Sequence, residues 1–277
     1  MTFYDTIAME LIGYDAVSFG NHDFDFGPAL LADFISTGFT NTFPPYLSAN
    51  IDFTGEPALQ ALVESGRIAR SVVIEKNGYT FGIIGATTPN LPFISRPANA
   101  VVDANLVTVV QNEINTLLKG GINKIIFVSH LQDLADDMAL IAQLSGVDIA
   151  VTGGSNDVLA NPGDLLLPGD MPGGTYPIIT KDLSDRQVSI VTTGGEYKYV
   201  GRLIVGFDDA TGEITSIDAD SGPVRVAGGA NSDAVMPDPI VQAQVIVPVK
   251  AFVDILETSV IARSEVALDG MRKKVRA

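Results

Sequence analysis

The side chains most able to do chemistry follow a short apolar run near the start of the chain. They lie in Gly20-Asn21-His22-Asp23-Phe24-Asp25-Phe26-Gly27, directly after Ala16-Val17-Ser18-Phe19, which is typical of a short buried strand. His22 is one of only two histidines in the chain. Amide, imidazole and carboxylate groups at a strand end can bind a metal ion and move a proton. Packing needs none of these groups, so the octapeptide predicts an enzyme.

Two further apolar runs end in small polar clusters. The run 125–128 leads into Ser129-His130, which contains the second histidine, and the run 147–152 leads into Gly153-Gly154-Ser155-Asn156-Asp157. Ligands of open α/β sheets bind at the carboxyl ends of the strands. The sequence therefore predicts that three strand ends form one site.

Each polar side chain in this predicted site suggests a role. Asn21 can offer a carbonyl oxygen to a metal ion, and His130 can offer an imidazole nitrogen. His22 is a second ligand or a general acid, with either Asp23 or Asp25 orienting its ring.

Plainer interpretations compete with these roles. His130 can be a structural histidine at a strand end, and Asn156 and Asp157 are as typical of a turn as of a ligand. Ser129 and His130 do not suggest a nucleophile–base pair, because neighbours on a strand point to opposite faces.

Composition restricts the classes of function. The chain has 277 residues, of which 46% are hydrophobic and 18% charged, as in a globular protein. The formal net charge of −16 argues against binding a nucleic acid polymer, although a small phosphate ester remains compatible when metal ions supply positive charge. The absence of cysteine excludes disulfides, thiol catalysis and Cys-ligated zinc. Any metal must be held by His, Asn, Asp or Gln, which suits Mn, Mg or Zn.

The sequence has neither the run of a membrane span nor the pattern of a signal peptide. No apolar run approaches the ~20 residues that cross a bilayer, so we expect no membrane span. No N-terminal segment has the pattern of a signal peptide.

The first 157 residues alternate between predicted strands and helices, which indicates a largely parallel or mixed sheet with helices on its faces. Lys76-Asn77-Gly78 predicts a hairpin between strands 71–75 and 79–84. Asp103 is the predicted cap of a helix that ends at Gly120-Gly121. The other predicted elements are helices at 5–13, 28–34 and 132–144, and strands at 15–19, 46–51, 125–128 and 147–152.

The remaining residues indicate antiparallel strands and a terminal helix. Strands are expected at 176–180, 187–193, 198–207 and 213–218, followed by a connector over 221–239. A helix from about 240 should kink at Pro248. The segment 264–277 is basic and resembles a linker.

The chain resembles the calcineurin-like metallophosphoesterases in the form found in 5′-nucleotidases. The octapeptide at Gly20 is similar to the signature of that family. The resemblance continues over nearly the whole chain, at the segments 13–17, 128–131, 197–203 and 266–276.

The resemblance implies a fold, a function and roles for residues. It implies an α/β (α+β sandwich) fold of mixed β-sheets flanked by helices, with a metallophosphoesterase-like domain at 1–262 and the start of a C-terminal domain at 263–277. The implied activity is hydrolysis of a phosphate monoester, such as a nucleotide, at two divalent metal ions about 3.5–4 Å apart. Asn21, His130 and Asn156 would be metal ligands, His22 the acid and Asp25 its orienting partner.

Departures from the family pattern suggest an incomplete centre. We expect the chain to lack the first strand–helix unit, which supplies Asp-x-His and Gly-Asp, and also the C-terminal nucleoside-binding domain. Gly154 stands where a metal-binding histidine is expected. The chain alone should therefore be weakly active or inactive, and the alternative is a non-catalytic binding or interaction module on the same fold. The resemblance also implies export to the periplasm, cell surface or extracellular space.

Overall fold

The structure is a computed structural model that describes residues 2–260, 262 and 263. It contains two compact units, Met1–Met236 and Pro237–Ala277. The domain boundary at 262/263 stays a prediction. The predicted basic linker at 264–277 lies outside the described residues.

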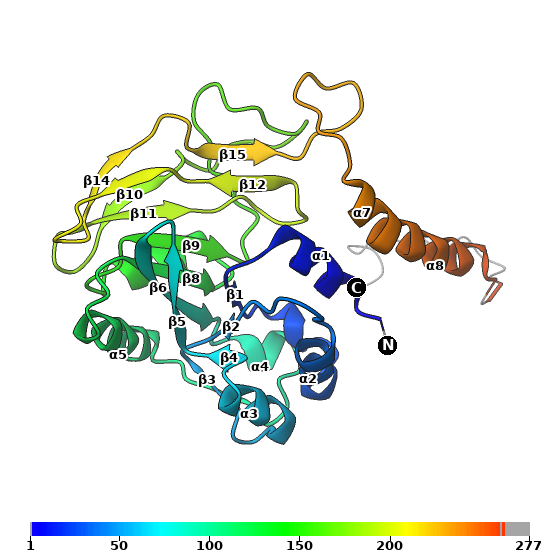
Figure 1. Cartoon of the computed structure of the whole chain (residues 1–277), viewed down its shortest axis with the longest axis horizontal. Coiled ribbons are helices and arrows are strands. Elements are labelled where there is room, and N and C mark those ends of the chain that lie inside the picture. Colours follow the sequence, from blue (N-terminus) through cyan, green and yellow to red (C-terminus); the bar gives the residue numbers. More distant parts are fainter. Residues whose placement is uncertain (1, 261, 264–277) are drawn as a thin grey trace. The chain divides into compact units, whose positions relative to one another are not determined.

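The first unit is built on a six-stranded mixed sheet with the order β10-β11-β9-β8-β6-β5 (Figure 1). The four central strands β11, β9, β8 and β6 are parallel, and the two edge strands are antiparallel to their neighbours. This confirms the predicted mixed α/β class. The strands are β5 (Ser71–Lys76), β6 (Tyr79–Thr87), β8 (Ile125–His130), β9 (Ile149–Gly153), β10 (Ile178–Lys181) and β11 (Gln187–Val191).

Two helices, α5 (Leu106–Lys119) and α6 (Leu134–Ile141), bury apolar side chains on one face of this sheet. Helix α5 places Val110, Ile114 and Leu117 one or two turns apart, so all three reach the same core. The prediction that Asp103 caps this helix is wrong. Asn105 is the cap and its side chain accepts from the Thr108 N–H, while Asp103 accepts from the Asn105 N–H instead.

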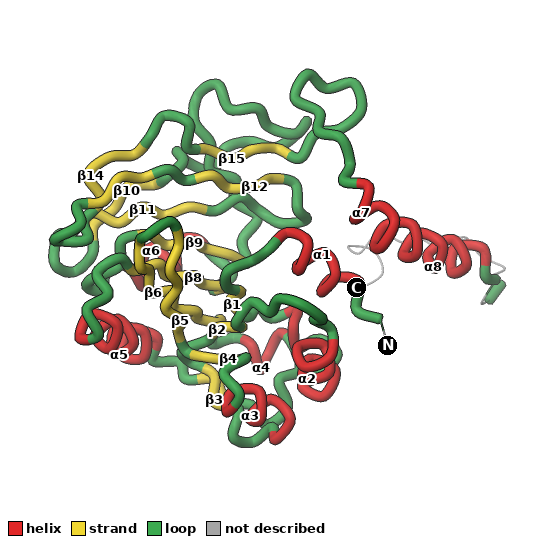
Figure 2. Tube along the Cα trace, in the orientation of Figure 1, coloured by secondary structure: helices red, strands yellow, loops and turns green. Residues whose placement is uncertain are grey.

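A second, smaller sheet has the parallel order β1-β2-β4 and its own aromatic core. Its strands are β1 (Val17–Ser18), β2 (Tyr46–Leu47) and β4 (Ile68–Ala69), and a separate pair is formed by β3 (Ile51–Asp52) and β7 (Val101–Val102). Four helices surround it in Figure 2, namely α1 (Tyr4–Ile12), α2 (Pro28–Thr37), α3 (Pro57–Glu64) and α4 (Leu91–Ile94). Of these helices, α3 and α4 were not predicted.

The two sheets are joined next to a predicted site residue. The hydroxyl of Thr87, at the end of β6, donates to the Phe19 carbonyl just after β1 at 3.0 Å. Thr87 is also the register partner of His130 on β8. This junction brings the end of β1 to the carboxyl ends of the central strands.

Two antiparallel pairs complete the first unit: β12 (Tyr199–Arg202) with β15 (Gly222–Arg225), and β13 (Val205–Phe207) with β14 (Ile214–Ile217). The strand β15 was predicted as part of a connector, because its Gly-Pro start argues against a strand. The Pro is tolerated because the pair has only two strands, so β15 has a free edge.

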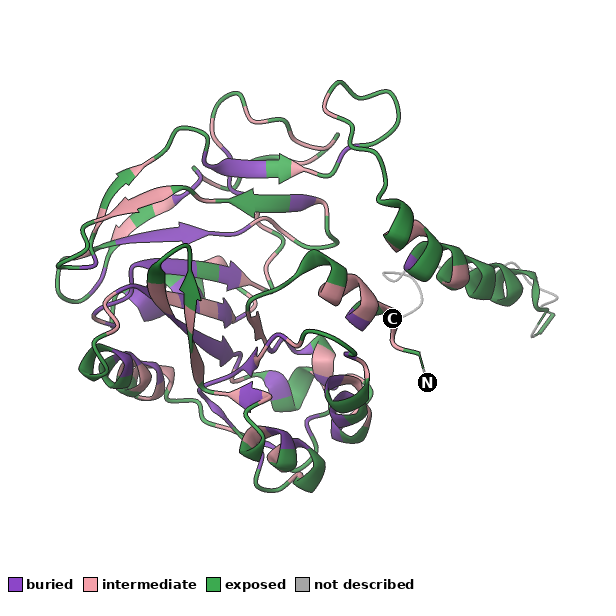
Figure 3. Ribbon diagram, viewed as in Figure 1, coloured by how far each residue is buried: buried purple, intermediate pink, exposed green. Residues whose placement is uncertain are grey.

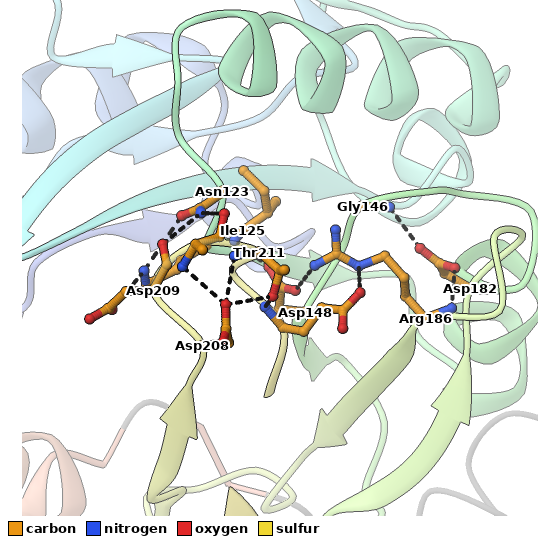
Figure 4. A network of polar contacts seen from close by, with 12 residues as sticks. Asn123, Ile125, Gly146, Asp148, Asp182, Arg186, Asp208, Asp209 and Thr211 are labelled. Carbon is orange, nitrogen blue, oxygen red and sulfur yellow. Dashed lines mark hydrogen bonds and ion pairs between the residues drawn. The ribbon is translucent and has the colours of Figure 1, made fainter. Parts of the chain in front are cut away.

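The turn after β13 is held against the opposite end of the main sheet (Figure 4). Asn123 donates to the backbone carbonyls of Asp209 and Ala210. Nearby, Arg186 pairs with the buried Asp148 at 2.8 Å. This polar network lies at the amino ends of β8 and β9, away from the predicted site.

The second unit is one helical run, consisting of α7 (Pro239–Val241), a π-helical turn η2 (Gln242–Ile246) and α8 (Val247–Thr258). Pro248 lies in the first turn of α8, where its missing N–H is tolerated, and the irregular turn directly precedes it. The described part of this helical run thus contains a π turn just before Pro248, and the kink at Pro248 stays a prediction.

The helical run is almost fully exposed in Figure 3. Over Pro239–Thr258 its mean hydropathy reaches 1.5 and only 6% of that window is buried, so by length and composition it meets the requirement for a membrane span. The core helix of a soluble protein and a signal sequence pass the same test, so a single such helix is weak evidence for a membrane span. The absence of a membrane span stays a prediction.

Candidate active site

The end of β1 approaches the end of β8 so closely that a side chain at Gly20 would not fit. A Cβ atom at Gly20 would lie 2.9 Å from Cε1 of His130. The two polar clusters that begin at Gly20 and Ser129 are therefore brought together, as predicted. Ser129 itself is buried on the other face of β8, where its hydroxyl donates to Asp137.

A short 3₁₀ turn, η1 (His22–Phe24), presents the first cluster to solvent. Phe24 is fully buried and packs against Phe19 with ring centroids 5.7 Å apart, which fixes the turn to the core. Residues three apart lie on the same side of a 3₁₀ turn. His22 and Asp25 consequently face each other on the exposed side.

His22 and Asp25 form a close pair. Nδ1 of His22 and Oδ2 of Asp25 are 2.6 Å apart, and 82% of the His22 side chain is exposed. The Ser95 hydroxyl donates to Oδ1 of Asp25 at 2.8 Å. These hydrogen bonds from His22 and Ser95 lower the pKa of the Asp25 carboxyl. Of the two candidate orienting carboxylates, the structure thus pairs Asp25 with His22.

Asp23 has a different position. Its Oδ2 accepts from the Gly20 N–H at 2.7 Å, which closes the loop that follows β1. Burial raises the pKa of Asp23 to about 6, although the Gly20 N–H bond opposes the shift. Asp23 therefore holds the loop rather than the His22 ring.

Asn21 and His130 form the second close pair of predicted site residues. Nε2 of His130 lies 3.0 Å from Oδ1 of Asn21, and Gln132 Nε2 donates to the same oxygen at 2.8 Å. Burial, followed by the nearby His22, lowers the pKa of His130, which favours the neutral imidazole. The sequence analysis missed Gln132. It lies in a loop, and no motif around it indicated a contact with Asn21.

Asn156 does not join these groups. It is exposed and lines a separate cavity of 160 Å³ with Glu196 and Lys198. Gly154 has φ +90°, and a Cβ there would lie 2.9 Å from the Gln132 backbone nitrogen. This backbone requires glycine at the position where the family resemblance places a histidine.

The paired groups open onto a cavity of 720 Å³. His22, Asp23 and His130 contribute polar atoms to it. Most of the remaining wall is apolar or aromatic. It comes from α1, β1, α2, β2, the residues that flank the two helices and the loop before β12, and includes Phe3, Met9, Tyr14, Val17, Phe26, Leu30, Leu31, Phe34, Tyr46 and Tyr197.

The donor set does not by itself fit a dinuclear metal centre. In the described part of the chain, no group of three or more His, Asp or Glu side chains is placed to hold a metal ion. Asn21 and His130, the two predicted ligands that lie together, are neutral, and the Asn21 oxygen already accepts two hydrogen bonds. A dinuclear phosphoesterase centre needs bridging and terminal ligands beyond this pair.

The chain is similar to known phosphoesterases. It is 33% identical to the 5′-nucleotidase of Mus musculus over 270 residues, which is 97% of this chain and 43% of that protein. The crystal structure of a 5′-nucleotidase precursor from Thermus thermophilus superposes with a TM-score of 0.80 at 31% identity, over 97% of this chain and 49% of that one. No family model matches the chain.

A more distant solved structure shows the fold. The calcineurin-like phosphoesterase of Bacillus subtilis superposes with a TM-score of 0.62 at 18% identity, over 93% of this chain and 76% of that one. The mixed sheet and this likeness show that the chain has the fold of a calcineurin-like phosphoesterase. Over 97% of its length, the chain is homologous to 5′-nucleotidases. It spans less than half of the length of the curated relatives it matches.

Proposed function

We propose that this chain carries the acid–base part of a phosphoric monoester hydrolase site whose substrates are nucleotide-like phosphomonoesters. The single observation that carries the proposal is the His22–Asp25 pair, 2.6 Å apart at the mouth of the cavity. The relatives named as 5′-nucleotidases support the choice of substrate class.

The His22–Asp25 geometry suits a general acid. Asp25 accepts the Nδ1 proton, so Nε2 of His22 is the nitrogen that can protonate the leaving oxygen. The carboxylate also stabilises the imidazolium form before the proton is given up. The chain has no cysteine and Ser129 is buried, so we assign the attack on phosphorus to water rather than to either of these side chains.

Asn21, His130 and Asn156 stay proposed metal ligands. Asn21 and His130 form one close pair and Asn156 is separate from them, which is too few donors for two ions. We therefore expect the chain alone to hydrolyse phosphomonoesters slowly, even with Mn²⁺ or Zn²⁺ added.

The test is hydrolysis of adenosine 5′-phosphate by the chain with Mn²⁺ or Zn²⁺, compared with His22→Ala. General acid catalysis contributes roughly 10²- to 10⁴-fold. A slow rate that falls at least about tenfold in His22→Ala supports the proposal. If His22→Ala hydrolyses the substrate at the same rate, His22 is not the general acid. If the unmodified chain is rapid and His22→Ala is inactive, the metal centre is not incomplete.

A second candidate function is a non-catalytic binding module on the same fold. The observation that favours it is Gly154, whose positive φ and closeness to Gln132 leave no room for a histidine. This candidate predicts that the chain binds a phosphomonoester without any hydrolysis that depends on His22.

We also propose that the protein is exported. The support is the names of relatives, which include a snake venom 5′-nucleotidase and a 5′-nucleotidase precursor. Secretion of a reporter fused to the native upstream coding sequence tests this proposal.

A further inference from the structure

The side chain of Gln132 reaches from a loop to the pair formed by Asn21 and His130. Its Nε2 donates to Oδ1 of Asn21 at 2.8 Å, and Nε2 of His130 lies 3.0 Å from the same oxygen. An amide oxygen has two lone pairs, so these two contacts fill its acceptor capacity. Asn21 is only 6% exposed, so little water competes for this oxygen. Gln132 thereby completes a closed set of three polar side chains.

The backbone of Gln132 has a conformation that glutamine rarely adopts. Its φ is +83°, in the left-handed region. Only Leu131 and Gln132 separate His130, the last residue of β8, from Asp133, the cap of α6, so the chain must turn sharply there. Glycine meets such a turn without strain, whereas other residues in this conformation are concentrated at functional sites. The contact of the side chain therefore explains the glutamine better than the turn does.

Gly154 leaves room for the Gln132 amide. A Cβ atom at Gly154 would lie 3.1 Å from Nε2 of Gln132, so the amide fills the space that the glycine leaves open. Nε2 is thus held between Gly154 on one side and Oδ1 of Asn21 on the other. The N–H edge of an amide carries partial positive charge. It faces the Asn21 oxygen in the way that a bound cation would.

The contact with Asn21 also decides which nitrogen of His130 carries the proton. An amide oxygen only accepts, so Nε2 of His130 is the protonated nitrogen. A histidine binds a metal ion through an unprotonated nitrogen, so Nε2 is no ligand while this hydrogen bond is present. Nδ1 faces Gly20 and Gly153, where Cβ atoms would lie 3.1 and 3.4 Å from it.

We propose that the amide of Gln132 takes the place of a cation at the Asn21–His130 pair, so that the chain closes this pair by hydrogen bonds and binds divalent ions there only weakly. The inference rests on the proposed function, which assigns Asn21 and His130 as ligands. The centre is then not only short of ligands but also closed at the two that lie together.

Nuclear magnetic resonance of the full chain labelled with ¹⁵N-histidine tests this inference, with Zn²⁺ as the only added probe. The chain has 33 acidic side chains, which attract Zn²⁺ at many places, but it has only two histidines. The signals of His130 therefore report on this site alone, and His22→Ala assigns them. In the metal-free chain at neutral pH, Nε2 of His130 should carry the proton and Nδ1 should not.

Variants at position 132 separate the effect of the amide from that of the turn. Gln132→Gly removes the donor and suits the positive φ, so Zn²⁺ should bind His130 at about a tenfold lower concentration than in the unmodified chain. Gln132→Glu keeps the side-chain length but replaces the donor with a carboxylate, so it should lower that concentration at least as far. Asn77→Gly is the matched control. Asn77 also has a positive φ, +53°, but it lies in the hairpin between β5 and β6, so the response of His130 should not change.

The inference is overturned if His130 responds at the same Zn²⁺ concentration in Gln132→Gly and in the unmodified chain, with circular dichroism showing both folded. A proton on Nδ1 instead of Nε2 in the metal-free chain also overturns it, because the hydrogen bond to Asn21 would then be absent. Neither result depends on turnover. Hydrolysis that His22→Ala leaves unchanged would contradict the proposed acid and leave the Gln132 assignment in place, so the two failures are distinguishable.

Discussion

At the scale of single residues, the polar groups after β1 have separate tasks. Asp25 pairs with His22, Asp23 holds the Gly20 N–H, and Asn21 reaches across to His130. Two carboxylates two positions apart thus differ in role because η1 turns one outward and leaves the other beneath the loop.

The Asp25 carboxylate should matter for catalysis more than its supporting hydroxyl. Asp25→Asn removes the negative charge that stabilises the His22 imidazolium, although its amide oxygen can still accept from Nδ1–H, so turnover should fall about 10- to 100-fold. Ser95→Ala leaves the Asp25 carboxylate in place and should lower turnover only about two- to fivefold. Steady-state rates of both variants check this ordering, and a larger loss in Ser95→Ala would contradict it.

Asp137 should make stability depend on pH. Its carboxyl is buried beside Ser129, and burial raises its pKa to about 7. Because the folded-state pKa lies above the ordinary aspartate value of 3.8, this carboxyl favours folding at low pH and loses that contribution between about pH 4 and pH 7.

Asp137→Asn keeps an acceptor for Ser129 but cannot ionise. It should raise the free energy of unfolding at pH 8 by about 2–4 kcal/mol and should flatten its decline with rising pH. Urea unfolding at pH 4, 6 and 8 measures both effects. The same pH dependence in variant and unmodified chain would show that Asp137 is not the group responsible.

At the scale of elements, the sequence predicted those helices and turns that depend on residues close together in the chain. Asn77 and Gly78 have φ values of +53° and +83°, the conformation that the Asn-Gly pair favours, and the predicted hairpin is present. The apolar spacing of α5 also predicted its buried face. Its cap was misplaced by two residues because Asp103 and Asn105 are both good caps, and only the fold decides between them.

The contacts of the candidate site that come from strand ends could be predicted from the sequence, whereas those that come from loops could not. The approach of Asn21 to His130 follows from two strand ends that meet. Gln132 lies in a loop with φ +83°, and Ser95 follows the short helix α4, so neither contact left a signal in the sequence. The separation of Asn156 from the cavity depends on how the loop after β9 turns at Gly154.

Replacing Gly154 with the expected histidine should not rebuild a metal site. Gly154→His places a Cβ against the Gln132 backbone at a positive φ, so it should cost about 1–3 kcal/mol of stability. Gly163→His is the control, since its φ is also positive but nothing lies within 4 Å. Thermal unfolding should show the larger loss for Gly154→His, and tighter Zn²⁺ binding by that variant would refute this view.

At the scale of the whole chain, the buried polar network and the candidate active site lie at opposite ends of the central strands. The network of Figure 4 joins the amino ends of β8 and β9, whereas His130 lies at the carboxyl end of β8. Asp148 is 1% exposed and accepts from the Ile125 N–H as well as from Arg186. Substitutions in this network should therefore affect folding and spare the site.

Arg186→Met should lower the free energy of unfolding by about 1–3 kcal/mol at pH 8, because it leaves a buried carboxylate without its cation. Burial already raises the pKa of Asp148 to about 6, so the loss should be smaller at pH 5, where the carboxyl can protonate. The double variant Arg186→Met/Asp148→Asn should recover part of the loss. Denaturant unfolding at pH 5 and pH 8 measures these free energies. An equal loss for Arg186→Met at both pH values would contradict the account.

The central claim is that His22 protonates the leaving oxygen of a phosphomonoester. The most direct measurement compares unmodified chain with His22→Ala on p-nitrophenyl phosphate, whose leaving group needs little protonation, and on an alkyl phosphate, whose leaving group needs much. The account predicts that His22→Ala slows the alkyl phosphate at least about tenfold more than the aryl phosphate. An equal loss on both substrates, or no loss on either, would contradict it.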